Sequence, residues 1–372
     1  MPGGRPPEQG PRRPPPVPGP DAPPQGQPWR GGPPPGTRHP PPPRPPARPP
    51  PRQPLPRQAA PPVAPPVAPQ HPAPATPRTD ATALVGQVGR GDGTGRRVWR
   101  TVARMMSSTS ASRELAELAA GSQLPVSTGR RIAVTSVRGG AGKSAIAAVL
   151  ASVYAARRAD PVLAADADPD GGSLAWRLGT RDVGTLADLA PRLLAARGGD
   201  LAGLEPLLSR TSTGLWVLPS GAPGQPHLAR NVTRALSRLF AVCVTDCGRG
   251  MDSPATVEVL SEAHAVVVVT PATADGVRST CDALERVAGA DRAASLSRVV
   301  IALNTISRDG RSALNGRAVR DALGRFDVPV VTVPHDRHLA AAAPISTDRL
   351  GEATMAEATR LAGHLLAHAK QL

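Results

Sequence analysis

The chain has 372 residues, 47 of them proline, and a formal net charge of +15. Its three cysteines form no CxxC pair, which argues against a disulfide scaffold, a zinc site or an iron–sulfur cluster and fits a reducing cytoplasm. No apolar segment opens the chain, so we expect no secretory signal. The longest apolar run, around residues 265–269, is far too short to span a bilayer.

Residues 1–95 are predicted to be a disordered, basic, proline-rich tail and linker. Residues 1–80 hold 34 of the prolines, and ten arginines against three acidic residues. So few aliphatic side chains cannot bury enough surface to offset the entropy lost on folding. A basic arm of this kind contacts nucleic acid, anionic lipid or an acidic partner, or it stays solvated without a dedicated partner.

Residues 96–127 are predicted to form a short helical connector. In the stretch RRVWRTVARMM, Trp99, Val102 and Met106 recur at helical spacing with arginines between them. A second short helix, SRELAELAA, ends at Gly121. A basic amphipathic helix can pack on its own domain, dock on a partner or lie on a membrane surface. These three options stay open at this point.

Residues 128–372 are predicted to form one α/β domain with a doubly wound, mostly parallel sheet flanked by helices. Short apolar strands alternate there with helical segments such as 145–156 and 275–287, a pattern typical of a parallel sheet covered on both faces. In such sheets, ligands bind at the carboxyl ends of the strands. The predicted strands are 132–137, 162–167, 215–220, 241–246, 265–270, 299–304 and 330–333.

The strongest motif is VRGGAGKS, Val137–Ser144, which follows the first strand and opens a helix. Glycines there let backbone N–H groups close around phosphate oxygens, and the helix N-terminus adds positive potential. Lys143 would neutralise the phosphates of ATP, and Ser144 would coordinate Mg²⁺. The nucleotide-binding residues predicted in this loop are Gly139, Gly140, Ala141, Gly142, Lys143, Ser144 and Ala145.

The loop departs from the plain GxxxxGK[ST] pattern, because Val137 stands at the first glycine. It fits the deviant form KGGxGK[ST], with Arg138 at the first lysine, and so resembles the MinD/ParA branch of P-loop ATPases over about residues 128–372. Within that branch, the layout is similar to the proline-rich MinD-like proteins of actinobacterial type VII (ESX) secretion loci. The resemblance implies Mg-dependent ATP hydrolysis and a homodimer in the ATP-bound state.

The family resemblance gives Arg138 a catalytic role across that dimer. In this family the first lysine of the deviant loop reaches the nucleotide of the second subunit, and Arg138 occupies its position. Arginine stays charged and can bind phosphate bidentately, although lysine and arginine are not interchangeable.

Two acidic motifs follow in the order that the family has. DADPDGG, Asp166–Gly172, is similar to switch I, which implies that Asp168 orients the attacking water, with Asp166 and Asp170 near the metal. VCVTDCGRG, Val242–Gly250, resembles Walker B plus switch II. Read without the resemblance, both motifs are strand ends followed by turns. The predicted metal site is Ser144, Asp166, Asp168 and Asp246, and the predicted catalytic set is Lys143, Asp168 and Arg138.

Two later segments are similar to those that flank the base in this family. Asn304 ends the strand VVIALN, and Pro334 and Asp336 lie in VTVPHD, so these three residues complete the predicted nucleotide site. Asn and Pro also commonly end strands for purely structural reasons. We expect His335 and His338 to lie on the loop surface rather than to bind a metal.

Three functions remain open from the sequence. The first is an ATP-driven switch that positions or regulates a membrane-associated machine, such as a type VII secretion system, through a protein partner. The second is a ParA-like partitioning ATPase that binds DNA nonspecifically through arginine, and the third is a non-catalytic ATP-binding module. We expect a cytoplasmic protein, with peripheral association at the inner face of the plasma membrane as an option. The last apolar segment, with Leu361, Leu365 and Leu366, is predicted to be a core helix rather than a membrane-targeting tail.

Overall fold

The computed structural model describes residues 113–370 apart from short gaps at 114–115, 118–119, 127, 169–171, 181–182, 197–200, 220–224, 226, 249, 289–295 and 308–313. The tail predicted over residues 1–95 and the first part of the connector lie outside this range. The end of the connector contacts the domain, because Arg158 Nη1 donates to the backbone oxygens of Ser122 and Leu124, at 3.3 and 2.9 Å.

Eight strands form one sheet in the order β3-β4-β2-β5-β1-β6-β7-β8. Neighbouring strands are parallel except β3 and β4, which are antiparallel. All seven predicted strands are present with small shifts at their ends. The sequence did not predict β3, because two residues are too few to show the apolar pattern of a strand. The strands are β1 (Arg130–Thr135), β2 (Val162–Ala167), β3 (Ser209–Arg210), β4 (Trp216–Leu218), β5 (Val242–Cys247), β6 (Ala265–Pro271), β7 (Val299–Asn304) and β8 (Val330–Val333).

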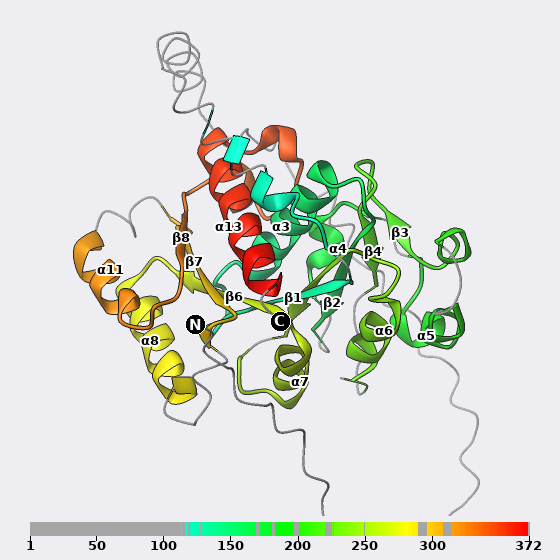
Figure 1. The fold of residues 1–372 in the computed structure, drawn as a ribbon, viewed down its shortest axis with the longest axis horizontal. Helices are drawn as coiled ribbons and strands as arrows, with labels where there is room; N and C mark the ends of the chain where they lie inside the picture. The colour runs from blue at the N-terminus through cyan, green and yellow to red at the C-terminus, as the bar shows by residue number, and fades with distance from the viewer. Residues whose placement is uncertain are drawn as a thin grey trace, which may run out of the picture. The chain divides into compact units, whose positions relative to one another are not determined.

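Helices cover both faces of the sheet, which confirms the predicted doubly wound α/β fold. Figure 1 shows α3, α4 and α13 on one face and α5, α6, α7, α8 and α11 on the other. The helices are α3 (Lys143–Arg157), α4 (Leu174–Arg177), α5 (Leu186–Ala195), α6 (Leu228–Leu236), α7 (Pro254–Glu262), α8 (Ala274–Ala288), α11 (Gly316–Gly324), α12 (Arg337–Ala340) and α13 (Glu352–Lys370), with 3-10 turns at Ala202–Leu204 and Thr347–Arg349.

The core lies on both sides of β1, as period-two alternation in a strand requires. Ile132 and Val134 belong to the apolar cluster under α3 and α13, while Ala133 between them belongs to the cluster under α7, α8 and α11. The fully buried Tyr154 of α3 donates its hydroxyl to the Ala362 oxygen of α13 at 2.8 Å. The three leucines predicted to make the last helix a core helix, Leu361, Leu365 and Leu366, are all buried.

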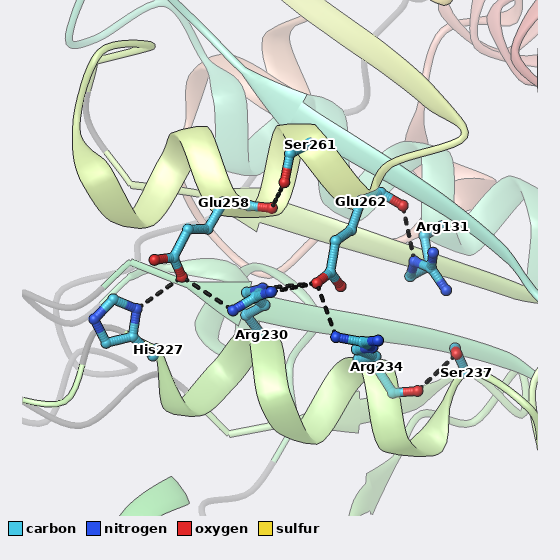
Figure 2. A network of polar contacts seen from close by, with 8 residues as sticks. All are labelled: Arg131, His227, Arg230, Arg234, Ser237, Glu258, Ser261 and Glu262. Atoms are coloured by element: carbon cyan, nitrogen blue, oxygen red, sulfur yellow. Dashed lines mark hydrogen bonds and ion pairs between the residues drawn. The ribbon is translucent and has the colours of Figure 1, made fainter. Parts of the chain in front are cut away.

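A network of ion pairs fixes α7 to α6 and to β1 (Figure 2). The carboxylate of Glu262 accepts hydrogen bonds from Arg230 and Arg234, and Glu258 Oε2 lies 3.2 Å from Arg230 Nη1. From β1, Arg131 Nε donates to the backbone oxygen of Glu262 at 2.9 Å. Because α7 comes after β5 and the switch II segment, this network anchors the downstream end of that segment.

The three central strands bring the acidic motifs together at one edge of the sheet. In the parallel pair β2 and β5, Asp166 is in register with Asp246, and Val134 of β1 is in register with Asp246 from the other side. The glycine-rich loop leaves β1 at the same edge. Among the described residues, no helix is both long and apolar enough to cross a membrane.

Candidate nucleotide-binding site

The loop Val137–Ser144 joins β1 to α3 and turns through two glycines in the left-handed region, Gly140 with φ 75° and Gly142 with φ 89°. Gly142 is also the N-cap of α3, and a Cβ atom there would lie only 2.4 Å from Asn304 Nδ2. The first turn of α3 itself carries no acidic residue, and the helix N-terminus contributes positive potential there. The turn can therefore present backbone N–H groups to an anion.

Lys143 opens α3 and forms an ion pair with Asp246, the acidic residue of the segment predicted to be Walker B. Its Nζ lies 3.5 Å from Oδ1 of Asp246, and the two side chains are only 11% and 1% exposed. Burial raises the pKa of the Asp246 carboxyl above its ordinary value, and the nearby Lys143 ammonium and Ser144 hydroxyl oppose that rise. At 3.5 Å the contact is longer than an ordinary charge-assisted hydrogen bond, so Lys143 leaves acceptor capacity on the Asp246 carboxylate. Its oxygens can therefore accept a further cation or a water.

Asp166 accepts two backbone hydrogen bonds from the segment predicted to be switch I and the helix after it. Its Oδ1 accepts a hydrogen bond from the backbone N–H of Asp168 at 3.1 Å, and its Oδ2 accepts one from Leu174 at 3.2 Å. Burial raises the pKa of Asp166 to about 7, the Asp246 charge adds to the rise, and the two backbone hydrogen bonds oppose it. A Cβ at Gly172 would lie 2.1 Å from these oxygens, so any other residue there would displace the Asp166 carboxylate.

The three carboxylates of Asp166, Asp168 and Asp246 lie close enough for their charges to interact, since the charge of Asp168 raises the pKa of both others. Such a cluster favours a divalent cation. In the described part of the chain, no group of three or more His, Cys, Asp or Glu side chains could hold a metal unaided. The Ser144 hydroxyl and the carboxylates fit Mg²⁺, which at nucleotides is usually bound through one or two carboxylates together with water and phosphate oxygens. Asp170 lies outside the described residues.

The predicted base side contains residues with structural tasks of their own. Asn304 Nδ2 donates to the Ala141 oxygen at 2.9 Å, so Asn304 braces the phosphate loop from β7. Asp336 follows Pro334, is 3% exposed and caps α12. Its oxygens accept from the backbone N–H groups of His338 (2.7 Å), Leu339 (3.3 Å) and Gly351 (2.7 Å). A direct contact of Asn304, Pro334 and Asp336 with a base stays a prediction.

His338 corrects one expectation from the sequence. The residue is 1% exposed, not on the loop surface, and its Nε2 accepts a hydrogen bond from Ser346 N at 2.9 Å. The proline and charged residues around it favour an exposed loop, but the cap at Asp336 folds the short helix α12 inward.

The side chain of Arg138 contacts α8. Its Nε donates to Ser279 Oγ at 3.0 Å, and its Nη2 lies 2.9 Å from Asp275 Oδ1. Both partners of the ion pair are about half exposed, with relative side-chain exposures of 46% and 56%. The Arg138 side chain is therefore held against α8, in a half-exposed position at the rim of the site.

Comparison with known proteins agrees with this geometry. Residues 132–344 match the model of the CobQ/CobB/MinD/ParA nucleotide-binding domain, which covers more than half of the chain. The chain belongs to this family. Over 233 residues it is 34% identical to the ESX-1 secretion-associated protein EspI of Mycobacterium tuberculosis (strain H37Rv), a match that covers 59% of this chain and 34% of that protein. The chain thus spans about a third of the length of this relative.

Two solved structures of similar fold are a ParA family ATPase from Chlorobium tepidum TLS and the cell division ATPase MinD of Pyrococcus furiosus. The first is 21% identical with a TM-score of 0.46, and the match covers 65% of this chain and 94% of that chain. The second is 23% identical with a TM-score of 0.48, and the match covers 64% of this chain and 99% of that chain.

Within this member of the family, the structure brings most of the predicted residues together and adds one that the sequence did not indicate. Lys143, Ser144, Asp166 and Asp246 meet at the carboxyl ends of β1, β2 and β5. The addition is Arg177 of α4, whose pKa is lowered by burial, with the negative charge of Asp246 opposing that effect. No motif marks Arg177, because it lies in an ordinary helical stretch after switch I.

Proposed function

We propose that the chain is an Mg²⁺-dependent ATPase that acts as a nucleotide-controlled switch. The observation that carries the proposal is the buried pair of Lys143 and Asp246 at the mouth of the glycine-rich loop. The carboxylates of Asp166 and Asp168 at the neighbouring strand complete the set that phosphoryl transfer to water requires: a phosphate cradle, a cation site and a group that orients water.

In the proposed mechanism, backbone N–H groups of the loop bind the phosphates and Lys143 transfers its contact from Asp246 to the phosphate oxygens. Bound Mg²⁺ would neutralise charge on the triphosphate beside Ser144. Asp168 orients the attacking water towards the γ-phosphate and accepts its proton. Asp166 acts through the backbone, since its hydrogen bonds to Asp168 and Leu174 fix both ends of the switch I turn.

The chain offers a matched control for the binding step, because Lys143 and Lys370 are its two lysines. Lys143→Ala should lose most of the affinity for Mg-ATP in isothermal titration, since it removes the one side-chain cation predicted in a cradle of backbone amides. Lys370→Ala, an exposed change at the end of α13, should bind as the wild type does. Equal affinities of the Lys143→Ala and Lys370→Ala proteins would refute the nucleotide-site assignment.

Hydrolysis separates the switch from a non-catalytic ATP-binding module. In single-turnover measurements with enzyme in excess, wild type should release phosphate, and Asp168→Ala should bind Mg-ATP with similar affinity but hydrolyse it at least about a hundredfold more slowly. If the wild type binds Mg-ATP tightly and shows no turnover, the chain is the non-catalytic module instead.

We propose further that ATP drives dimerisation and that Arg138 then acts in trans. Two facing triphosphates bring several negative charges into one interface, and one extra cation from each subunit would relieve the repulsion. The exposed position of Arg138 at the rim supports this, although it must first leave Asp275. The Asp168→Ala protein should scatter light as a dimer in Mg-ATP and as a monomer in ADP, and adding Arg138→Ala should return it to the monomer. A monomer throughout would refute the dimer.

We propose also that the switch acts at a membrane-associated secretion machine, and the 34% identity to EspI over 233 residues supports this. Deleting the gene in the native host should lower the amount of type VII substrates in the culture medium. Wild type should restore it and Lys143→Ala should not. Unchanged secretion would remove this part of the proposal.

DNA partitioning is the competing assignment. The test is retention on a nonspecific duplex at low and high salt, since arginine–phosphate binding weakens steeply with salt. ATP-dependent, salt-sensitive retention would favour the partitioning function. The proposed location, cytoplasm or the inner face of the plasma membrane, is tested by co-sedimentation with anionic vesicles in ATP and in ADP.

A further inference from the structure

Helix α4, which directly follows switch I, is bonded to the segment that follows β8. Trp176 Nε1 donates to the Ala342 oxygen at 3.0 Å, Arg177 Nη1 donates to the Leu339 oxygen at 3.4 Å, and Ile345 N donates to the Arg177 oxygen at 2.7 Å. We call this contact between residues 174–179 and 339–345 the α4 bridge. It joins segments that leave β2 and β8, strands with β5, β1, β6 and β7 between them in the sheet.

One end of the α4 bridge reaches the phosphate side of the site. Leu174, the first residue of α4, is fully buried, and its backbone N–H donates to Asp166 Oδ2 at 3.2 Å. The same carboxylate accepts the N–H of Asp168, so a shift of α4 pulls on the segment that carries Asp168.

The other end reaches the loop that is predicted to flank the base. Asp336 caps α12, which places Leu339 at the end of a fixed turn, and it also holds Gly351 N. The chain then turns at Ala342, a non-glycine residue with φ 55°, and the oxygen of this strained residue is the one that Trp176 binds. A left-handed alanine persists only where its surroundings fix it, so the bridge is a determined part of the fold.

We infer that the α4 bridge transmits occupancy of the base loop to switch I, with Trp176 and Arg177 as the positioning residues. This inference rests on the proposed ATPase function. A base bound along Pro334–Asp336 steadies α12, the bridge then steadies α4, and the hydrogen bonds from Leu174 and Asp168 to Asp166 hold Asp168 in place. A ligand that fills only the phosphate loop leaves the bridge without this support.

The test compares ADP with pyrophosphate, a ligand of the phosphate loop that has no base. The readout is hydrogen exchange of the α4 amides, in particular those of Arg177 and Leu178, which donate to the Ser173 and Leu174 oxygens. In wild type, ADP should slow exchange of these amides by roughly threefold to tenfold, and pyrophosphate should have little effect. Equal protection by both ligands would overturn the inference, because the signal would then come through the phosphates.

The variant Trp176→Phe keeps an aromatic ring, although a smaller one, and removes the N–H that binds the Ala342 oxygen. It should abolish the protection by ADP, while its affinity for ADP stays within about twofold of wild type and its kcat falls by roughly twofold to tenfold. Arg177→Ala should act in the same direction. The control is Arg337→Ala, which removes an exposed arginine of α12 and should behave as wild type. Loss of affinity and kcat in equal proportion would show a merely structural role for Trp176 and overturn the coupling.

The exchange experiment also separates this inference from the proposed function. A protein that binds ADP without protecting α4 overturns the coupling and leaves the ATPase proposal intact. A protein that protects α4 with ADP but never hydrolyses ATP supports the coupling and refutes the ATPase. A protein that binds no ADP refutes both.

Discussion

The raised pKa of Asp166 makes the stability of the nucleotide-free protein depend on pH in a defined direction. The folded-state pKa is about 7 and the ordinary value is 3.8. A group with a raised folded-state pKa binds more protons in the native state than in the unfolded state. The contribution of Asp166 to the free energy of unfolding is therefore complete below about pH 4 and is lost as the pH rises towards and through 7. The free energy of unfolding should fall over that window.

The size of the effect follows from the shift. From pH 5 up to the folded-state pKa, a span of roughly two pH units, Asp166 is protonated in the folded protein and ionised in the unfolded chain. Over this span the free energy of unfolding should fall by about 3 kcal/mol. For a domain of this size, each kcal/mol moves Tm by roughly 2–4 °C. Asp246, whose pKa is raised by burial as well, acts in the same direction.

Urea unfolding at pH 5 and pH 8 without nucleotide or Mg²⁺ measures this slope. In Asp166→Asn, the loss of stability between pH 5 and pH 8 should be smaller than in wild type by about 3 kcal/mol. The variant should itself be less stable than wild type by roughly 1 kcal/mol at pH 5, because the amide has one acceptor oxygen for two backbone N–H groups. Asp321→Asn, an exposed change on α11, should keep the wild-type slope. If the stability curves of wild type and Asp166→Asn run parallel from pH 5 to pH 8, the carboxyl is not protonated in the folded state and the reasoning is wrong.

Three further predictions concern the loop, the rim and the tail. Gly142→Ala, at φ 89°, should lower stability by about 1–2 kcal/mol in thermal melts and weaken ATP binding, whereas Gly324→Ala, with no atom near its Cβ, should leave binding unchanged. Asp275→Asn releases Arg138 from a half-exposed pair worth roughly 0.2–1 kcal/mol, so sedimentation in Mg-ATP should show a several-fold tighter dimer, and a weaker one would contradict the proposed role in trans. Removing residues 1–95 should leave the Tm unchanged, and a collapse of helix content would show that the tail is structural.

The sequence predicted the fold well because its signals are local and repeated. Each strand of the parallel sheet is a short, continuous apolar run, and each is followed by a segment with helical spacing or by a polar turn. This alternation of strands and helices indicates that helices cover both faces of the sheet. The strand β3 was missed because Ser209 and Arg210 pair with β4 only through tertiary contact. The buried position of His338 was missed for the same reason, since it depends on the three backbone groups that Asp336 gathers.

The chemistry of the site was predictable to the extent that it lies in contiguous motifs. Lys143, Asp166 and Asp246 each stand at the end of a strand or the start of a helix, and their predicted tasks come from contiguous motifs that resemble those of the MinD/ParA family. The cis partners of Arg138, by contrast, lie more than a hundred residues away on α8. No spacing rule connects a glycine-rich loop to the polar residues of a helix that follows another strand.

The contacts that the sequence could not show are those that connect the parts of the site. Motifs indicate which groups meet the phosphates, but a switch also needs the base, the phosphates and the switch segment to respond together. In this chain that connection runs through hydrogen bonds to backbone oxygens, such as those from Trp176 and Arg177 to Ala342 and Leu339. Backbone acceptors exist at nearly every residue, so the sequence of residues 339–342 carries no mark of the contact. The donors alone have identifiable side chains, and substitution of Trp176 is therefore the most direct way to separate binding from switching.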